Sequence, residues 1–587
     1  MARPQVLLAT EGTYPFHQGG VSTWCDTLVH RLTDVDFIIF AVAMNPYVET
    51  LFDMPGNVLR TVAVPLWGMQ DPSEHRDDLA YSEIFLQKQR TGSQQIHALF
   101  LPVFQQFLDG LTHDEPGQIG PALARLYRYF RTYDYQTTFK AQEVWDTYKT
   151  WVLATTRRGY WNNPSVFESV QGLGWIYHFL TILNTAIPST DIIHSSAAAF
   201  CGMVGIVSKL EYGTPYLLTE HGVYLREQYL AIGRSNMTPF SKRFLIGLVK
   251  AISRENLFWA DELVPVCHFN GRWERVLGAN PEKIRVIYNG VSAARFSPRP
   301  TTPPAHKSPL EVLAVARIDP NKDLETLLRA VKLVTSFNIP VHVRILGSVT
   351  VPEYEQKLLS LREQLGLGQI VEFLGHHDNV SDAYRAADIT VQSSITEAFP
   401  YSVLESMMSG VPMVATDVGG TREALGSAGI LVPSRDPAQL ALGIAALAQD
   451  DGMRRQLGTL ARQRALQYFE ISNTIAAFSS LYRRWQSPET EHLTPRGSPD
   501  PTDATRSFAL LSVTRGLALT RLRAWQPALM QFEEALKVLG MHPAAIPVLM
   551  EMATVEMQLG LTREAEQHLL KSRLIEAYHD RESSSAG

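Results

Sequence analysis

The part of the chain that most constrains its fold is residues 386–423, AADITVQSSITEAFPYSVLESMMSGVPMVATDVGGTRE. Two short apolar runs, 389–391 and 411–415, are typical of parallel strands that are buried on both faces. Between them, Pro400 suits the start of a helix, where its missing N–H costs nothing, and Gly410 suits the end of that helix. The stretch therefore predicts a strand–helix–strand unit of an open α/β sheet.

Two carboxylates flank the predicted start of this helix, Glu397 in the preceding loop and Glu405 in the second turn. A helix N-terminus attracts phosphate through its unbonded N–H groups and its partial positive charge. Carboxylates at that place repel a phosphate, so we expect them to accept hydrogen bonds from hydroxyl groups. A ligand with both features is a nucleotide sugar. Taken singly, Glu397 as a helix cap and Glu405 as a solvated charge are simpler interpretations.

A second candidate for phosphate binding follows the predicted strand 310–316. Arg317 and Lys322 precede a helix for which Asp323 is the candidate N-cap. Positive charge beside a helix N-terminus is unfavourable unless an anion lies there. A guanidinium fork and an ammonium group together suit a pyrophosphate.

Two further sites are predicted at strand-to-helix turns in the first half of the chain. Gly19 and Gly20 lie between the apolar run 5–10 and a helical pattern, where bare backbone lets a ligand approach closely. His221 falls at the carboxyl end of the predicted strand 215–222, and ligands bind at such ends in open α/β sheets. The structural alternatives are turn glycines and a packed histidine.

Composition excludes several classes of protein. A hydrophobic content of 45% is too high for a disordered chain, and a net charge of −6 gives no footprint for nucleic acid. The three cysteines are far apart and predict buried thiols in a reducing compartment. Residues 1–10 lack the pattern of a signal peptide, and the apolar run 197–207 is too short to span a bilayer. We expect a soluble, cytoplasmic protein, and we interpret the DVD sequence at 34–36 as a turn and not a metal site.

Changes in pattern along the chain predict its domains. The boundaries are listed here: a first α/β domain over 1–300 with a helical insertion over about 67–170, a second α/β domain over 308–468, a closing helix over 469–485, a linker over 486–506, and a tetratricopeptide-like helical tail over 507–580. A proline-rich segment, 297–307, is the predicted linker between the two large domains. The basic and aromatic residues of the insertion are interpreted as core and solvated rim, with a sugar chain or a membrane surface as alternative partners.

Taken together, these residues resemble the retaining, GT-B-fold, family-four glycosyltransferases over about residues 4–485. The ordered set that carries the resemblance is Arg317 and Lys322, YNGV at 288–291, FLGHHDNV at 373–380, VATDVGG at 414–420, and Glu397-x7-Glu405. The segments 7–24 and 217–229 are similar to the subgroup typified by PelF, the Pel exopolysaccharide glycosyltransferase. The tail is not part of that pattern.

The resemblance implies an α/β protein of the GT-B class, in which a Rossmann-like acceptor domain over 1–300 faces a Rossmann-like nucleotide-sugar domain over 308–468 across a cleft, with a small all-α tail. It implies that Arg317 and Lys322 neutralise the donor diphosphate, and that Glu397 and Glu405 accept from sugar and ribose hydroxyls. His221 is expected beside the reacting face of the sugar. The other implied donor contacts are Gly19 and Gly20 at the phosphate, Leu374 and Gly375 at the base, and Tyr401 and Ser402 in place of the amide lost at Pro400.

The implied function is retaining transfer of a hexose from UDP-glucose or a related UDP-sugar to a growing polysaccharide or other glycan, in exopolysaccharide biosynthesis. The expected mechanism is a front-face route without a metal or a cofactor other than the donor. A lipid-linked acceptor, membrane-bound polysaccharide-synthesis partners at the inner face of the membrane, and a protein bound to the tail are further expectations. The alternatives are a scaffold with a nucleotide-sugar-sensing body, or another GT-B enzyme such as a sugar-nucleotide epimerase.

Overall fold

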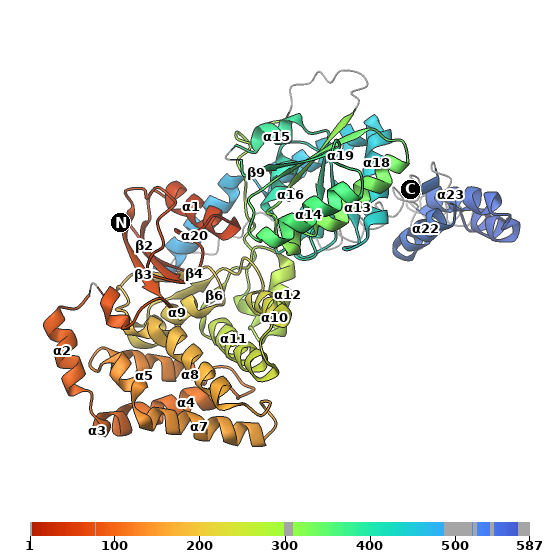
Figure 1. The fold of residues 1–587 in the computed structure, drawn as a ribbon. Coiled ribbons are helices and arrows are strands. Elements are labelled where there is room, and N and C mark those ends of the chain that lie inside the picture. The colour runs from red at the N-terminus through yellow and green to blue at the C-terminus, as the bar shows by residue number, and fades with distance from the viewer. Residues whose placement is uncertain are drawn as a thin grey trace, which may run out of the picture. The chain divides into compact units, whose positions relative to one another are not determined.

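The computed structural model describes residues 3–298, 309–486, 519–520, 525–539 and 545–572, except residues 77 and 378. The chain forms two compact units, and each is built around one sheet of six strands (Figure 1). The first unit contains Met1–Tyr288 and Ile475–Leu493, and the second contains Asn289–Thr474 and Thr494–Gly587. All strand pairs are parallel, which confirms the predicted α/β class.

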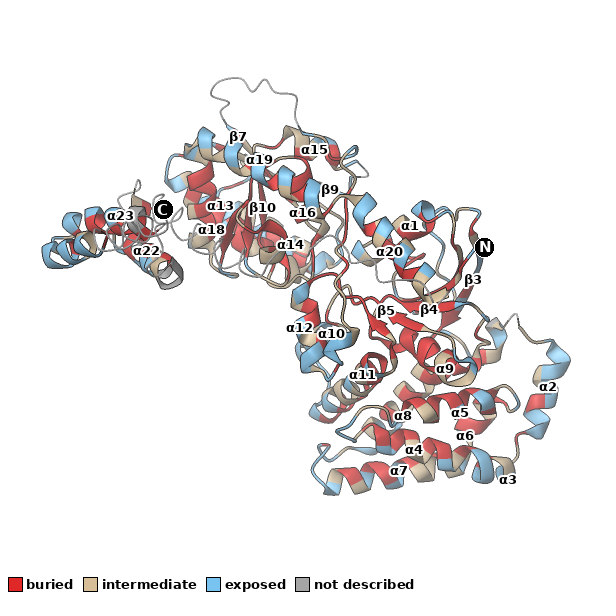
Figure 2. Ribbon diagram, turned by 180° about the vertical axis from the view of Figure 1, so that it is seen from behind, coloured by how far each residue is buried: buried red, intermediate tan, exposed pale blue. Residues whose placement is uncertain are grey.

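The sheet of the first unit has the order β3-β2-β1-β4-β5-β6. Its strands are β1 Gln5–Glu11, β2 Asp36–Ala43, β3 Val58–Pro65, β4 Ile192–Ser195, β5 Tyr216–Leu218 and β6 Glu262–Leu263. Successive residues of a strand point to opposite faces, so Val6 and Leu8 enter one core and Leu7 and Ala9 enter another. Both faces of the central strands are buried, as is typical of parallel sheets, whereas much of the edge strand β3 is exposed (Figure 2).

Helices cover the two faces. One core contains residues of α1 (Gly20–Arg31) and of α20 (Ile471–Gln486), whose Phe478 and Tyr482 contact Trp24 and His194. The other core contains α9 (Met203–Tyr212), α11 (Pro239–Trp259) and the helices between β3 and β4. α10 (Tyr224–Arg234) and α12 (His268–Val276) follow β5 and β6.

The segment between β3 and β4 is helical. Its main helices are α2 Tyr81–Arg90, α4 Leu101–Gly110, α5 Gly120–Phe130, α6 Tyr135–Lys140, α7 Gln142–Arg157 and α8 Val166–Leu180. Most of its aromatic rings are core: Phe100, Phe104, Phe130 and Phe139, for example, pack against one another inside the unit.

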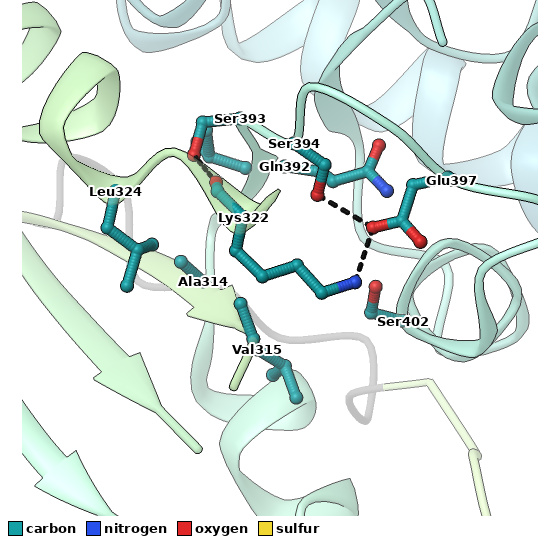
Figure 3. Close-up of a pocket in the computed structure, with 11 residues that line it drawn as sticks. Ala314, Val315, Lys322, Leu324, Gln392, Ser393, Ser394, Glu397 and Ser402 are labelled. Atoms are coloured by element: carbon teal, nitrogen blue, oxygen red, sulfur yellow. Dashed lines mark hydrogen bonds and ion pairs between the residues drawn. The ribbon is translucent and has the colours of Figure 1, made fainter. Parts of the chain in front are cut away.

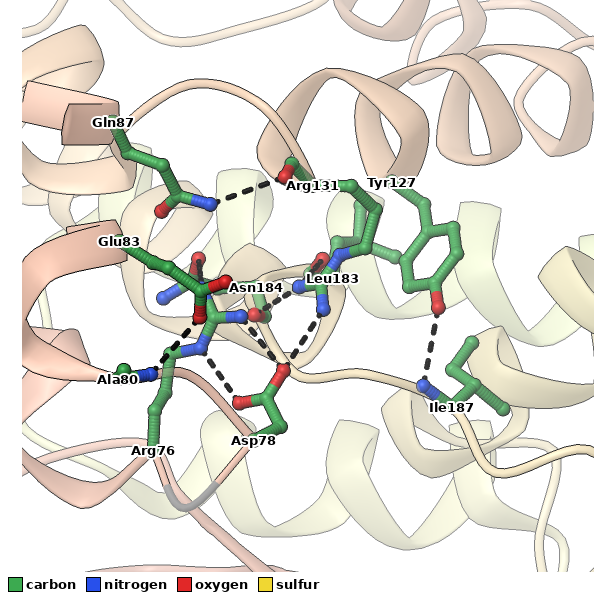
Figure 4. A network of polar contacts seen from close by, with 10 residues as sticks. All are labelled: Arg76, Asp78, Ala80, Glu83, Gln87, Tyr127, Arg131, Leu183, Asn184 and Ile187. Carbon is green, nitrogen blue, oxygen red and sulfur yellow. Dashed lines mark hydrogen bonds and ion pairs between the residues drawn. The ribbon is translucent and has the colours of Figure 1, made fainter.

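A partly buried network of charges fixes the start of this helical segment (Figure 4). Arg76 donates to both oxygens of Asp78 at 2.9 and 2.7 Å, and Arg131 at the end of α5 donates to the same carboxylate at 3.2 Å. Arg76 also donates to Asn184, 3.1 Å away. Burial opposes ionisation of Asp78, but the hydrogen bond and the charges of the two arginines outweigh it and lower the pKa of this carboxyl.

The sheet of the second unit has the order β12-β11-β10-β7-β8-β9. Its strands are β7 Leu310–Val315, β8 Val341–Leu346, β9 Val371–Gly375, β10 Ile389–Gln392, β11 Met413–Thr416 and β12 Ile430–Val432. Its helices are α13 Leu324–Ser336, α14 Pro352–Gln364, α15 Ser381–Ala386, α16 Tyr401–Met408, α17 Thr421–Leu425, α18 Pro437–Gln449 and α19 Asp451–Tyr468. Asp323 caps α13 as predicted, accepting from Thr326 N.

Some predicted boundaries differ from the structure. Residues 283–287, at the end of the first predicted domain, form only an isolated bridge, in which Ile284 pairs with Leu263. The boundary between the first and the second unit falls after Tyr288 and not near residue 300, because Val291 pairs with Glu470 inside the second unit. Most of the linker predicted at 297–307, and nearly all of the one at 486–506, lie outside the described residues.

The C-terminal region is helical where it is described. α22 (Trp525–Leu539) packs against α23 (Ala545–Gln558) through Phe532, Val548 and Met552, and residues 562–572 are also helical. Its relation to tetratricopeptide repeats stays a prediction. Every helix in the described ranges is too short or too polar to cross a bilayer.

Candidate functional site

The loop that joins β10 to α16 is held in one shape by contacts with neighbouring segments. Thr416 Oγ1 donates to Ser394 O at 2.6 Å, and Gly420 N donates to Ala398 O at 2.6 Å. Gly419 has φ +59°, and a Cβ there would lie 1.7 Å from Glu397 O. Only glycine fits this position, so the VGG turn brings backbone directly against the segment that carries Glu397.

The structure brings Lys322 and Glu397 together (Figure 3). Lys322 Nζ lies 2.5 Å from Glu397 Oε1, and Ser394 Oγ donates to the same oxygen at 2.6 Å. The side chains are 20% and 10% exposed, so the pair opens to the surface. A pocket beside it is lined by Ser402 of α16 and by Gln392 at the end of β10.

The two loops that carry this pair are also joined through their backbones. Ser393 Oγ donates to Lys322 O at 2.8 Å, and Ile395 N donates to Asn321 O at 2.9 Å. The consecutive serines after β10 therefore fix both charged residues, Ser393 through the backbone of Lys322 and Ser394 through the carboxylate of Glu397. The sequence reasoning did not single out these serines. Two hydroxyls directly after a buried strand were the available signal.

Glu405 lies in the second turn of α16, where it accepts from Tyr384 OH at 3.0 Å. Burial raises the pKa of this carboxyl, although the hydrogen bond from Tyr384 lowers it in part. The same hydroxyl also donates to Ser402 O at 3.2 Å. Glu405 is thus tied to α15 and is not the solvated charge of the simpler interpretation.

The other predicted residues of the second unit lie at the same edge of its sheet, because parallel strands end there together. Arg317 follows β7 and is exposed, and no described residue forms a hydrogen bond or ion pair with its guanidinium. Leu374 and Gly375 end β9. Tyr401 and Ser402 occupy the first two positions of α16, with Pro400 as its N-cap.

The predicted residues of the first unit occupy strand-to-helix turns. Gly19 is the N-cap of α1 and Gly20 its first residue, and nothing lies within 4 Å of a Cβ built at Gly19. The His221 ring contacts Trp24 with centroids 4.5 Å apart, and burial lowers its pKa to about 3. Its Nε2 has no hydrogen-bond partner among the described residues, so the ring is neutral with one nitrogen unbonded. The donor contacts expected of these three residues stay predictions.

Two buried carboxyl groups lie in this part of the first unit, Glu220 directly before His221 in the chain and Glu274 in α12. Glu220 and Glu274 of α12 are 1% and 0% exposed. Glu220 Oε1 accepts from Tyr224 N at 3.1 Å, whereas Glu220 Oε2 and both oxygens of Glu274 have no partner among the described residues. Burial raises the pKa of Glu220 to about 8 and that of Glu274 to about 9. Both groups therefore hold a proton at neutral pH.

Comparison with known families divides the chain into two parts. Residues 4–282 match a domain of unknown function, DUF3492, and residues 301–464 match the family glycosyl transferases group 1. Together these matches cover both sheets.

Several curated proteins are similar in sequence to about half of the chain or less. The D-inositol 3-phosphate glycosyltransferase of Geodermatophilus obscurus is 30% identical over 310 residues, 49% of this chain and 67% of its own length. That of Saccharomonospora viridis is 30% identical over 311 residues, 50% of this chain and 70% of its own length. WcaL of Escherichia coli, assigned to colanic acid biosynthesis, is 33% identical over 202 residues, 32% of this chain and 48% of its own length.

Solved structures with the same fold cover more of the chain. Sucrose-phosphate synthase from Thermosynechococcus elongatus has a TM-score of 0.52 at 17% identity, over 83% of this chain and all of that chain. Anabaena HepE, in complex with UDP and glucose, has a TM-score of 0.50 at 14% identity, over 82% of this chain and 99% of that chain. These similarities confirm the predicted GT-B fold of two Rossmann-like domains.

Proposed function

The chain belongs to the glycosyl transferases group 1 family, and from this premise we propose that it transfers a hexose from UDP-glucose or a related UDP-sugar to a glycan acceptor. The single observation that supports this most strongly is the Lys322–Glu397 pair, 2.5 Å apart at the carboxyl edge of the second sheet. One member is a cation suited to a phosphate, and the other is an acceptor suited to sugar hydroxyls. HepE, which shares the fold, was crystallised with UDP and glucose.

We propose that donor binding separates this pair. A diphosphate between Lys322 and the exposed Arg317 replaces the carboxylate as the partner of the ammonium group. Glu397 then accepts from hydroxyls of the sugar, while Ser394 keeps one of its oxygens in place. Glu405 accepts from the ribose hydroxyls.

The same residues account for catalysis. Negative charge develops on the leaving diphosphate as the bond to the anomeric carbon breaks, and fixed cations stabilise that charge more in the transition state than in the ground state. In the front-face route, the leaving phosphate oxygen takes the proton of the acceptor hydroxyl, which gives retention. The proposal requires no metal, so transfer is expected to survive a chelator.

We further propose that the acceptor is a growing exopolysaccharide, free or lipid-linked, and that the helical tail binds a protein of the same biosynthetic assembly. The similarity to WcaL supports the first part of this proposal. The role of the tail is tested by comparing the amount of polysaccharide produced with the full chain and with a chain that ends at residue 506.

The test of the proposed function uses purified full-length protein and a panel of UDP-, GDP- and ADP-sugars. A donor at about 100 times its Kd stabilises the native state by about 2.7 kcal/mol, which a thermal-shift assay detects. The proposal predicts that a UDP-sugar raises Tm and that UDP is released only when a glycan acceptor is added. Conversion of the donor to its epimer without an acceptor, or no response to any nucleotide sugar, would contradict it.

A further inference from the structure

We infer that one edge of the helical segment in the first unit is a docking surface for an anionic lipid bilayer. We call it the basic edge. It is formed by the carboxyl end of α7, the first turns of α8 and the residues from the end of α10 to the start of α11, and the side chains used below are Val166, Phe167, Val170, Arg157, Arg158 and Arg243.

Contacts between these elements show that they form one surface. Thr238, the N-cap of α11, donates to the Glu168 carboxylate in the first turn of α8, and Ser241 Oγ donates to Gln171 Oε1 at 3.0 Å. Trp161, between α7 and α8, lies against Phe244 of α11 with centroids 5.4 Å apart. Figures 1 and 2 both show the carboxyl end of α7 and the starts of α8 and α11 at one edge of this unit.

The basic edge exposes apolar side chains that the core leaves out. Val166, Phe167 and Val170 are 75%, 74% and 53% exposed. They lie at spacing i, i+1 and i+4, so they form one stripe on the first turns of α8, while Ile176 and Leu180 of the same helix are buried. Contiguous exposed apolar side chains of this kind mark interaction surfaces, whereas single exposed apolar residues are common on any protein.

The segments that form the basic edge carry an excess of positive charge. Residues 153–171 and 229–243 contain five basic residues and one acidic residue, which are Arg157, Arg158, Arg234, Lys242 and Arg243 against Glu168. The chain as a whole carries a net charge of −6, so this local excess is not a property of its composition. The single acid already accepts from Thr238 and from the backbone of Ser165.

An anionic bilayer matches both properties. Its phosphates attract the basic side chains, and the boundary of its acyl chains accepts the apolar stripe. A polyanionic glycan would use the charges and would stack a sugar ring on Phe167, but it would leave the aliphatic Val166 and Val170 in water. A second copy of the basic edge in a twofold contact would place like charges opposite each other, which is unfavourable.

The test is flotation of the full-length protein with vesicles of phosphatidylcholine alone or mixed with phosphatidylglycerol. We expect binding to the mixed vesicles only. Raising the salt from about 0.1 M to about 1 M shortens the screening length from about 10 Å to about 3 Å and should weaken binding strongly. Phe167→Asp should weaken it about tenfold or more, and Arg157→Glu combined with Arg158→Glu should also weaken it.

A matched control is Phe85→Asp, which places the same charge at a 53% exposed phenylalanine on α2, away from the basic edge in both views. It should leave vesicle binding unchanged. Equal binding to both kinds of vesicle, no binding, or an equal loss in the Phe85 variant would overturn the inference. So would a dimer in size-exclusion chromatography that Phe167→Asp dissociates without any binding to vesicles, since the surface would then serve self-association.

Discussion

The buried carboxyl of Glu274 gives a prediction about stability that does not depend on the proposed function. Both of its oxygens are without a hydrogen-bond partner among the described residues, and burial raises its pKa to about 9 from an ordinary value of 4.5. Glutamine has nearly the same shape and takes up no proton on folding. We therefore expect Glu274→Gln to stabilise the first unit at neutral and alkaline pH.

The magnitude follows from the shift in pKa. One pKa unit corresponds to about 1.4 kcal/mol, so at about pH 7.5 the uptake of a proton from an ordinary pKa of 4.5 costs about 4 kcal/mol. The buried amide of glutamine also lacks partners, which offsets part of this gain. The expected net gain is about 1–3 kcal/mol.

The raised pKa of Glu274 also determines how the free energy of unfolding changes with pH. The pKa of the folded state is raised, so this group contributes stability below about pH 4.5 that is lost as the pH rises toward about 9. Between these limits, Glu274 should lower the free energy of unfolding of the wild type by about 1.4 kcal/mol for each pH unit. Glu274→Gln should remove this contribution to the pH dependence.

Urea unfolding followed by tryptophan fluorescence measures this effect, because every tryptophan except Trp525 lies in the first unit. Glu282→Gln, at an exposed position of the same unit, is the control and should change nothing. Two results would show that Glu274 is not held protonated. In one, the free energy of unfolding of Glu274→Gln depends on pH as in the wild type between about pH 5 and 8; in the other, the variant is less stable at every pH in that range.

The other predictions concern the donor site and the charged network of the first unit. Lys322→Ala and Glu397→Ala should each lower transfer at least about 100-fold in a nucleoside diphosphate release assay, with an unchanged circular dichroism spectrum; wild-type turnover in either would refute its role. Ser394→Ala should raise the donor KM and lower kcat/KM about tenfold while Ser394→Thr restores both. Ser409→Ala, which removes a buried hydroxyl without a partner among the described residues, should not change either constant. Asp78→Asn should destabilise the first unit by about 3 kcal/mol in the same urea assay, and a loss below about 0.5 kcal/mol would show that the arginines do not need this carboxylate.

Sequence reasoning reached the parts of the fold that local patterns encode. The cap at Asp323, the helix start at Pro400 and the strands that flank it depend on residues close in sequence, and all are present in the structure. β3 was not predicted because it borders the sheet and Leu59 is exposed, so no continuous apolar run marks it. β12 was not predicted either, because its three residues are too few to show a strand pattern.

Contacts between distant residues were the part that sequence could not supply. The sequence interpretation assigned Lys322 to the diphosphate and Glu397 to the sugar. It did not predict the ion pair between them, because the two residues are 75 positions apart in the chain. The unpartnered carboxyl of Glu274 is equally invisible, because a glutamate in a helix normally faces water. Such features require the tertiary structure.

The most direct test of the central claim is a crystal structure of the protein with a bound UDP-sugar. We expect the diphosphate within hydrogen-bonding distance of Lys322 Nζ, a sugar hydroxyl bound to Glu397, and the Lys322–Glu397 ion pair broken. A bound donor whose diphosphate and sugar contact neither residue would contradict it.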